Sequence, residues 1–194
     1  NFPVSQNRLN FGPSSGATFG YAAVVDPLTA QLWGAGAGFD SNLQSQTGAV
    51  LGINSLGQIE SSFALRLGGN GSSCAVQGFN YCQAGSSSVV RGLALDASGR
   101  RLWAVGTQYD ALGGHPVLFV AAIDLNSNNV VSFQVEGSTG TLARGAGISA
   151  DGSVWVAGVK DGASALWNID ADVGMQFLGI FAGAGEADAV VEAQ

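Results

Sequence analysis

The sequence has little charge. Only 11% of its 194 residues are Asp, Glu, Lys or Arg, far below the roughly 25% of ordinary soluble domains, and Lys160 is its only lysine. The net charge is −7, and the one basic pair, Arg100–Arg101, lies in an expected turn. Nucleic acids and anionic membranes both bind clustered Lys and Arg, so no partner of either kind is expected. A weakly charged surface carries little electrostatic repulsion, which favours association between copies of the chain.

Long apolar runs and helical periodicity are also missing. No apolar run approaches the ~20 residues of a membrane-spanning helix, so membrane insertion is not expected. The hydrophobic fraction of 46% nevertheless excludes a disordered chain. Glycine is abundant, at 30 residues, and lacks the every-third spacing of collagen. Together with Val, Ala, Leu and Phe it is typical of short strands joined by tight turns. We therefore predict an all-β fold with no helix of note.

Signatures of catalysis are scarce. His115 is the only histidine, so a Ser-His-Asp triad would depend on the GGHPV loop, which has no nucleophile motif around it. The 14 acidic residues are scattered singly, and no carboxylate pair of a glycosidase is recognisable. We expect a protein that is not an enzyme and that uses no cofactor, with a hydrolase as an alternative.

One turn has oxygen ligands at alternating positions, like the start of a calcium-binding loop: Asp124, Asn126 and Asn128. The sixth position of such a loop requires Gly and the twelfth requires Glu, but this chain has Asn129 and Val135 there. A plain hairpin turn is therefore the favoured interpretation, with calcium binding as the alternative.

The two cysteines, Cys74 and Cys82, have no neighbouring His or Cys pair that would complete a zinc site. They are either two free buried thiols or a local disulfide, and the polar, Gly- and Ser-rich loop around them favours the disulfide. A disulfide places the protein outside the cytosol, in an extracellular or cell-surface location. The glycosylation sequon at Asn70 is compatible with this location, and Asn1-Phe2-Pro3 is typical of the start of a processed chain.

A hairpin pattern occurs three times. Two short apolar strands flank a polar turn, and each second strand contains a tryptophan: Trp33, Trp103 or Trp155. Each hairpin extends into a four-stranded unit within a single domain, 1–194. The units cover about 20–67, 91–137 and 145–183, and residues 68–90, which hold the cysteines, are interpreted as an insertion. Four strands and a period near 50 residues are typical of β-propeller blades.

The motifs ISADGSVWVAG (148–158) with ALWNID (165–170), and LALDASGRRLWAVG (93–106) with VAAID (120–124), combine Asp-x-x-Gly with an aromatic-Val-x-Gly strand end. In this the chain resembles the bacterial β-propeller repeat proteins. The resemblance implies blade-like antiparallel repeats and a secreted or surface protein. Closed propellers have 4–8 blades, whereas three units form an open, propeller-like arc. A β-prism with internal threefold symmetry is the alternative fold.

Both ends of the chain resemble single strands of the repeat. Residues 1–16, with Leu9 and Phe11, resemble a fourth strand, and residues 187–194, with Ala189, Val190 and Val191, resemble a first strand. Such orphan strands can complete the sheet of another molecule. The sequence thus predicts a non-enzymatic structural or interaction protein that assembles with copies of itself into a filament, ring or layer.

Carbohydrate is the alternative partner, because a repeated tryptophan can form a sugar-stacking platform. Since Trp33, Trp103 and Trp155 lie within apolar runs, core packing is the favoured role for them. The aromatic residues expected to be exposed for stacking are Trp167, Phe39, Tyr81 and Tyr109.

Overall fold

The computed structural model describes residues 19–40, 44–68, 73–170 and 174–180. The described residues form an all-β fold without a helix. They therefore contain no helix that is long and apolar enough to cross a membrane. They contain 14 strands in four antiparallel sheets. The strands are β1 (Phe19–Val25), β2 (Leu32–Asp40), β3 (Ser45–Ile53), β4 (Ile59–Leu65), β5 (Ala75–Val76), β6 (Phe79–Asn80), β7 (Ser87–Asp96), β8 (Arg101–Tyr109), β9 (Val117–Asp124), β10 (Asn129–Val135), β11 (Thr141–Ile148), β12 (Val154–Lys160), β13 (Ala163–Asp170) and β14 (Gly174–Ile180).

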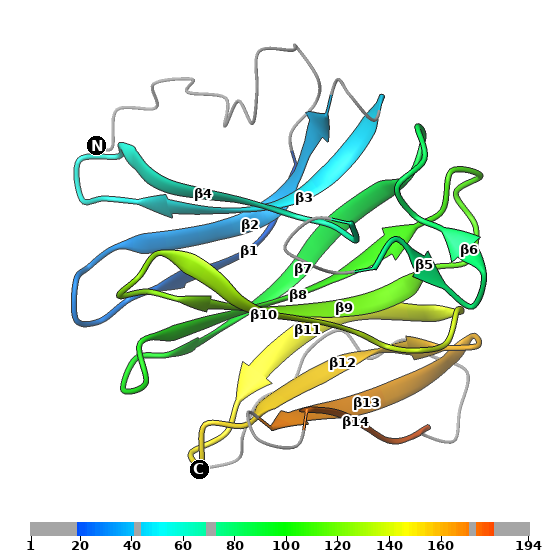
Figure 1. Ribbon diagram of the computed structural model, residues 1–194. Coiled ribbons are helices and arrows are strands. Elements are labelled where there is room, and N and C mark those ends of the chain that lie inside the picture. The colour runs from blue at the N-terminus through cyan, green and yellow to red at the C-terminus, as the bar shows by residue number, and fades with distance from the viewer. Residues whose placement is uncertain (1–18, 41–43, 69–72, 171–173, 181–194) are drawn as a thin grey trace.

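Three of the sheets have four strands each, and in each of them every strand pairs with the next one along the chain. We call them the first sheet (β1–β4), the middle sheet (β7–β10) and the last sheet (β11–β14), as Figure 1 shows. The fourth sheet is the short β5–β6 hairpin. The hairpins expected at 22–36, 91–106 and 145–158 are β1–β2, β7–β8 and β11–β12. The turns of these hairpins contain polar residues and residues in the left-handed backbone conformation, such as Gly152 with φ at 85°.

Two separate cores hold the three large sheets together. One lies between the first and middle sheets and includes Trp33, Leu102 and Phe119. The other lies between the middle and last sheets and includes Trp103 and Trp167. The middle sheet is therefore covered on both faces, which explains why nearly all of β9 (VLFVAAID) is buried.

The arrangement of these cores differs from that of a β-prism, in which three sheets share one core. Neither core cluster combines described residues of the first sheet with those of the last. The middle and last sheets approach each other closely where their first strands meet: a Cβ on Gly92 in β7 would lie 2.7 Å from the backbone nitrogen of Ala146 in β11. Only glycine permits that approach, so Gly92 sets how closely the middle and last sheets pack.

Candidate assembly surfaces

The strand β14 is an exposed edge without charge. Its sequence, GMQFLGI, contains no Asp, Glu, Lys, Arg or Pro, and among the described residues it pairs only with β13. Three of its large apolar side chains are partly exposed: Phe177 at 42%, Leu178 at 48% and Ile180 at 52%. An uncharged apolar edge of this kind offers free backbone N–H and C=O groups to another strand.

The corresponding edges of the other two sheets are better protected. Register shifts leave one bulged residue in each fourth strand, which is Glu60 in β4, Val131 in β10 and Leu178 in β14. The bulge of β4 thus carries an acid, which discourages strand pairing. The strand β10 is flanked by the disulfide-bearing segment, because Phe133 and Val135 pack against the cluster that contains Tyr81. Among the described residues, β14 has neither an acid at its bulge nor a covering segment, and a nearby charge is that of Lys160, whose Nζ lies 4.6 Å from the centroid of the Phe177 ring.

A second apolar surface lies on the first sheet, on the face turned away from the middle sheet. Four directly paired residues, one from each strand, form a row across it: Val25, Leu32, Ile53 and Ile59. Directly paired residues share one face of a sheet. Val25 is 56% exposed, Leu32 38% and Ile59 49%, and Ile53 is half-buried. We call these four residues the outer row.

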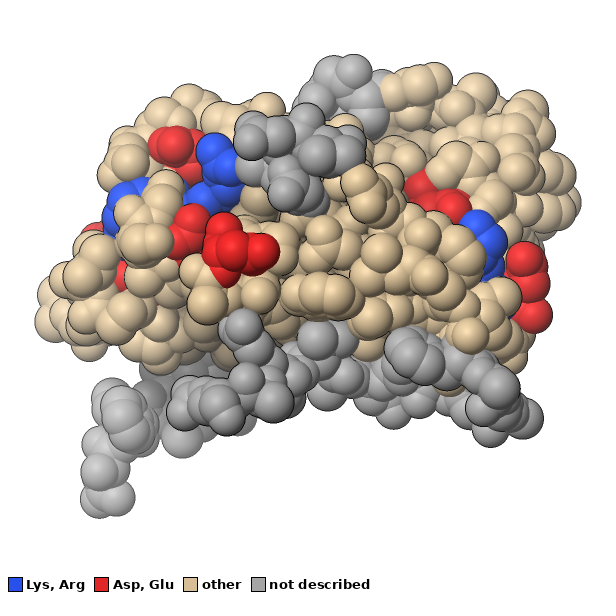
Figure 2. Space-filling model, turned by 90° about the horizontal axis from the view of Figure 1, so that it is seen from below, with Lys and Arg blue, Asp and Glu red and all other residues tan. Residues whose placement is uncertain are grey.

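Charged side chains are sparse on the surface as well as in the sequence. Figure 2 shows one face of the molecule on which the acidic and basic side chains form two separate groups with uncharged surface between them. On this face, the described residues form no large patch of one sign of the kind that attracts nucleic acid or anionic lipid.

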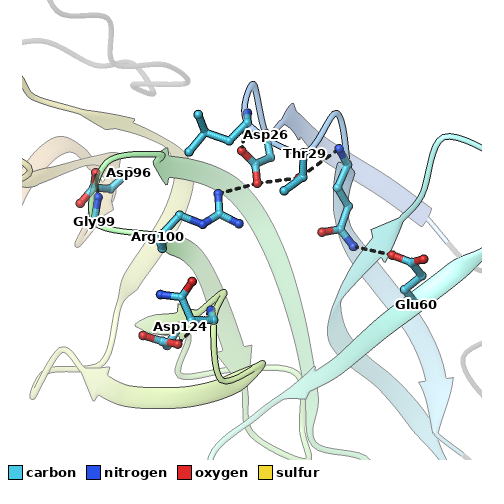
Figure 3. A network of polar contacts seen from close by, with 10 residues as sticks. Asp26, Thr29, Glu60, Asp96, Gly99, Arg100 and Asp124 are labelled. Carbon is cyan, nitrogen blue, oxygen red and sulfur yellow. Dashed lines mark hydrogen bonds and ion pairs between the residues drawn. The ribbon is translucent and has the colours of Figure 1, made fainter.

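A polar cluster at the hairpin turns ties the first sheet to the middle sheet (Figure 3). Asp26 is fully buried, and its carboxylate accepts hydrogen bonds from Leu28 N at 2.9 Å and Thr29 Oγ1 at 2.8 Å. Arg100, from the β7–β8 turn, donates to Asp26 Oδ2 at 2.6 Å. Burial raises the pKa of Asp26, but the hydrogen bonds from Arg100, Leu28 and Thr29 outweigh it, so this pKa lies below its usual value. The cluster is a structural tie between two sheets.

The disulfide predicted from the sequence is present. Cys74 and Cys82 are bonded, and they close the segment that contains the β5–β6 hairpin. The hydroxyl of Tyr81, which is fully buried, donates to the backbone oxygen of His115 at 2.6 Å. The ring of Phe79 stacks on that of His115, with 3.7 Å between their centroids. The cross-linked segment is thereby fixed to the β8–β9 loop.

The β8–β9 loop contains an Asp–His pair that the sequence did not indicate. Nδ1 of His115 lies 2.6 Å from Oδ2 of Asp110, whose Oδ1 accepts hydrogen bonds from Leu112 N and Gly114 N. The hydrogen bond from His115 lowers the pKa of Asp110, and the two backbone N–H groups add to that shift. These contacts give the carboxylate a role in shaping its own loop, as an Asx turn does. A spacing of five residues between Asp and His in a Gly-rich loop was the available signal.

The tryptophans divide between core and surface. Trp33 and Trp103 are buried, as predicted, and Trp155 is half-buried. The expectation that Trp167 and Tyr81 are exposed was wrong, because both are fully buried. Trp167 faces the middle sheet, with its ring 5.7 Å from that of Phe177. The two other candidates for stacking, Phe39 and Tyr109, are half-buried.

The turn considered for calcium forms a self-capped hairpin. Asp124 Oδ1 accepts hydrogen bonds from the backbone nitrogens of Asn126, at 3.0 Å, and Ser127, at 2.6 Å. Asn128 takes the left-handed conformation, with φ at 55°. These hydrogen bonds lower the pKa of Asp124, the one from Ser127 most strongly. Within the ranges that the structure describes, no group of three or more His, Cys, Asp or Glu could hold a metal ion.

Several predicted sites lie outside the described residues. These are the candidate assembly strands, with Leu9, Phe11, Ala189, Val190 and Val191, and the sequon at Asn70.

The chain matches no protein-family model and no curated protein sequence.

Proposed function

We propose that this protein is a non-enzymatic structural protein, secreted or displayed at the cell surface, that assembles with copies of itself by completing β-sheets between molecules. The edge of β14 carries this proposal, because it is apolar, partly exposed and without charge. Natural sheets protect such edges with charge, proline or a covering segment. Here we expect a strand of a second copy to pair with it.

The arrangement of the three large sheets supports an open assembly unit. Each sheet is a four-stranded meander like a propeller blade. Two separate cores in a row, with the middle sheet between them, favour a propeller-like arc over a β-prism. An arc has two ends, and both can contact another molecule. The disulfide between Cys74 and Cys82 supports a location outside the cytosol.

A charge placed on the β14 edge tests the proposal. We expect Leu178→Lys to prevent assembly, because the lysine must lose water when a strand pairs beside it. Size in solution is measured against concentration by light scattering coupled to gel filtration, and the particles are examined by electron microscopy. Deletion of residues 187–194, the candidate strand that would complete the sheet of another molecule, is also expected to prevent assembly.

The matched control is Val131→Lys. Val131 is the bulged residue of β10 and is 52% exposed, close to the 48% of Leu178, but it lies on the strand flanked by the disulfide-bearing segment. The control is expected to assemble like the unmodified chain. An unmodified chain that stays monomeric at every concentration, or a Leu178→Lys variant that assembles normally, would refute the proposal.

A further inference from the structure

The outer row of the first sheet has a buried counterpart in each of the other two large sheets. Each counterpart, like the outer row, consists of four residues, one from each strand, that are directly paired from one strand to the next. In the middle sheet it is Leu95, Leu102, Ile123 and Val130, and in the last sheet it is Ile148, Val154, Ile169 and Met175. The two central members of both counterparts are fully buried. In the outer row, Val25, Leu32 and Ile59 are exposed and Ile53 is half-buried. The same surface feature thus occurs three times, and in the part of the chain that the structure describes a second sheet covers it twice.

A tryptophan of the preceding sheet belongs to the core that covers each buried row. Trp33 of the first sheet lies in one core with Leu102 and Ile123. Trp103 of the middle sheet lies in the other core with Val154 and Ile169. In both cases the aliphatic residue directly before the tryptophan belongs to a row, and the tryptophan itself points to the opposite face of the sheet.

The last sheet repeats this arrangement with Trp155. Its neighbour Val154 belongs to the buried row, so Trp155 lies on the face turned away from the middle sheet. Its directly paired neighbours are Gly147 and Asn168, and Asn168 pairs with Gln176, so the row around Trp155 has no charge. Trp155 is half-buried, while Trp33 and Trp103 are buried. Among the described residues, the Trp155 face therefore has no following sheet and the outer row has no preceding one. Ala157, the next residue of β12 on the Trp155 face, is buried, so the accessible part of this face is its Trp155 end.

We infer that the Trp155 face of one molecule packs against the outer row of a second copy, in a head-to-tail contact. This inference rests on the proposed self-assembly and names the surfaces that meet. A second copy is the fitting partner because the chain itself packs this kind of face on this kind of row twice. Both surfaces are uncharged, so neither needs a charged partner. A contact between two different surfaces leaves one of each free, and it therefore continues into a fibre or closes into a ring.

Directed cross-linking tests the contact. The two native cysteines are bonded to each other, so an introduced cysteine supplies the only free thiol. One variant carries Trp155→Cys and the other Leu32→Cys, and the two are mixed under assembly conditions and oxidised. We expect cross-linked dimers in the mixture and only background amounts with either variant alone. Leu112→Cys replaces Leu32→Cys as the control, because Leu112 is 92% exposed and lies in the β8–β9 loop.

Three results would overturn the inference. Cross-linking of Trp155→Cys with itself would show a symmetric contact between two Trp155 faces. Equal cross-linking with Leu112→Cys would show random collision. Particles that assemble without any cross-link between positions 155 and 32 would show that other surfaces meet.

A second measurement avoids introduced cysteines. We expect Leu32→Glu to raise the concentration needed for assembly at least about tenfold, as loss of a central interface contact does, and Leu112→Glu to leave it unchanged. Trp155 is half-buried while the other three tryptophans are buried, so we expect iodide to quench mainly Trp155 and the quenching to decrease on assembly of the unmodified chain. Equal assembly of both Glu variants, or unchanged quenching, would contradict the inference. If the unmodified chain assembles, Leu178→Lys blocks assembly and position 155 stays accessible, then strand completion stands and only the head-to-tail contact fails.

Discussion

The ion pair between Asp26 and Arg100 should be a main tie between the first and middle sheets, and its loss should destabilise the fold measurably. The perturbation is Asp26→Asn, which keeps an oxygen to accept from Leu28 N but removes the negative charge beside Arg100. The Arg100 guanidinium would then lose its charged partner. The Arg100 side chain is only 20% exposed, and the side chain at position 26 is fully buried.

The magnitude follows from this partial exposure. Removing one partner of a fully buried ion pair costs about 3–5 kcal/mol, and a hydrogen bond to a charged group contributes about 1.5–3 kcal/mol. Water reaches Arg100 in part, so Asp26→Asn should lower the free energy of unfolding by about 2 kcal/mol, which is less than for a fully buried ion pair and within the range for a hydrogen bond to a charged group. For a chain of this size that corresponds to a fall in Tm of about 4–8 °C.

Urea unfolding of monomeric protein, followed by tryptophan fluorescence, measures the change. Asp96→Asn is the matched control, because Asp96 also caps a hairpin turn, accepting from Ser98 Oγ and Gly99 N at 2.7 Å each. A double-mutant cycle with Arg100→Met then isolates the pair, for which we expect a coupling energy of about 1.5–2 kcal/mol. Additive effects of the two substitutions, or equal losses for Asp26→Asn and Asp96→Asn, would refute the view that this pair ties the sheets.

Two further predictions concern the disulfide and pH. Replacing Cys74 and Cys82 together by Ala should lower the free energy of unfolding by about 2–3 kcal/mol, and unchanged urea unfolding of this variant would contradict a stabilising cross-link. The pKa values of Asp26, Asp96 and Asp110 are all lowered in the folded chain, so the stability that they contribute is complete above the unfolded pKa of about 3.9. It is lost as the pH falls through the folded values, and urea unfolding between pH 7 and 3 should show a flat region that declines only below about pH 4. Stability that fell as the pH rose from 5 to 7 would contradict the sign.

Turn chemistry and composition were sufficient to predict an all-β chain and its three hairpins, but not the short β5–β6 hairpin within residues 68–90. The low charge, the many glycines and the repeated polar turns gave an all-β chain, and hairpins are present at the three expected places. The disulfide was also predictable, because Cys74 and Cys82 lie close together in a polar loop where a free thiol gains little from burial. These features are local, so each can be derived from a few neighbouring residues.

Whether a given side chain of a sheet is buried or exposed was harder to predict, because this depends on which element packs against each face of the sheet. Trp167 was expected to be exposed, yet Ala165, Trp167 and Ile169 alternate along β13 and all point into the core with the middle sheet. This period of two was visible in ALWNID and could have placed Trp167 correctly. Tyr81 had no such signal. Its burial depends on the β8–β9 loop, where its hydroxyl meets the backbone of His115, far away along the chain.

The two ends of the row of sheets differ in kind, and this difference makes the proposed assembly directional. The first sheet ends in an aliphatic row that includes Val25 and Leu32, and the last sheet ends in a face with Trp155. A symmetric dimer through Trp155 would leave both outer rows in water, and one through the outer rows would leave both tryptophan faces uncovered. Head-to-tail growth covers one surface of each kind at every new contact. Because burial of apolar area is the main driving force here and charge repulsion is weak, we expect a continuous series of sizes or a closed ring, and no dimer that persists as an end point.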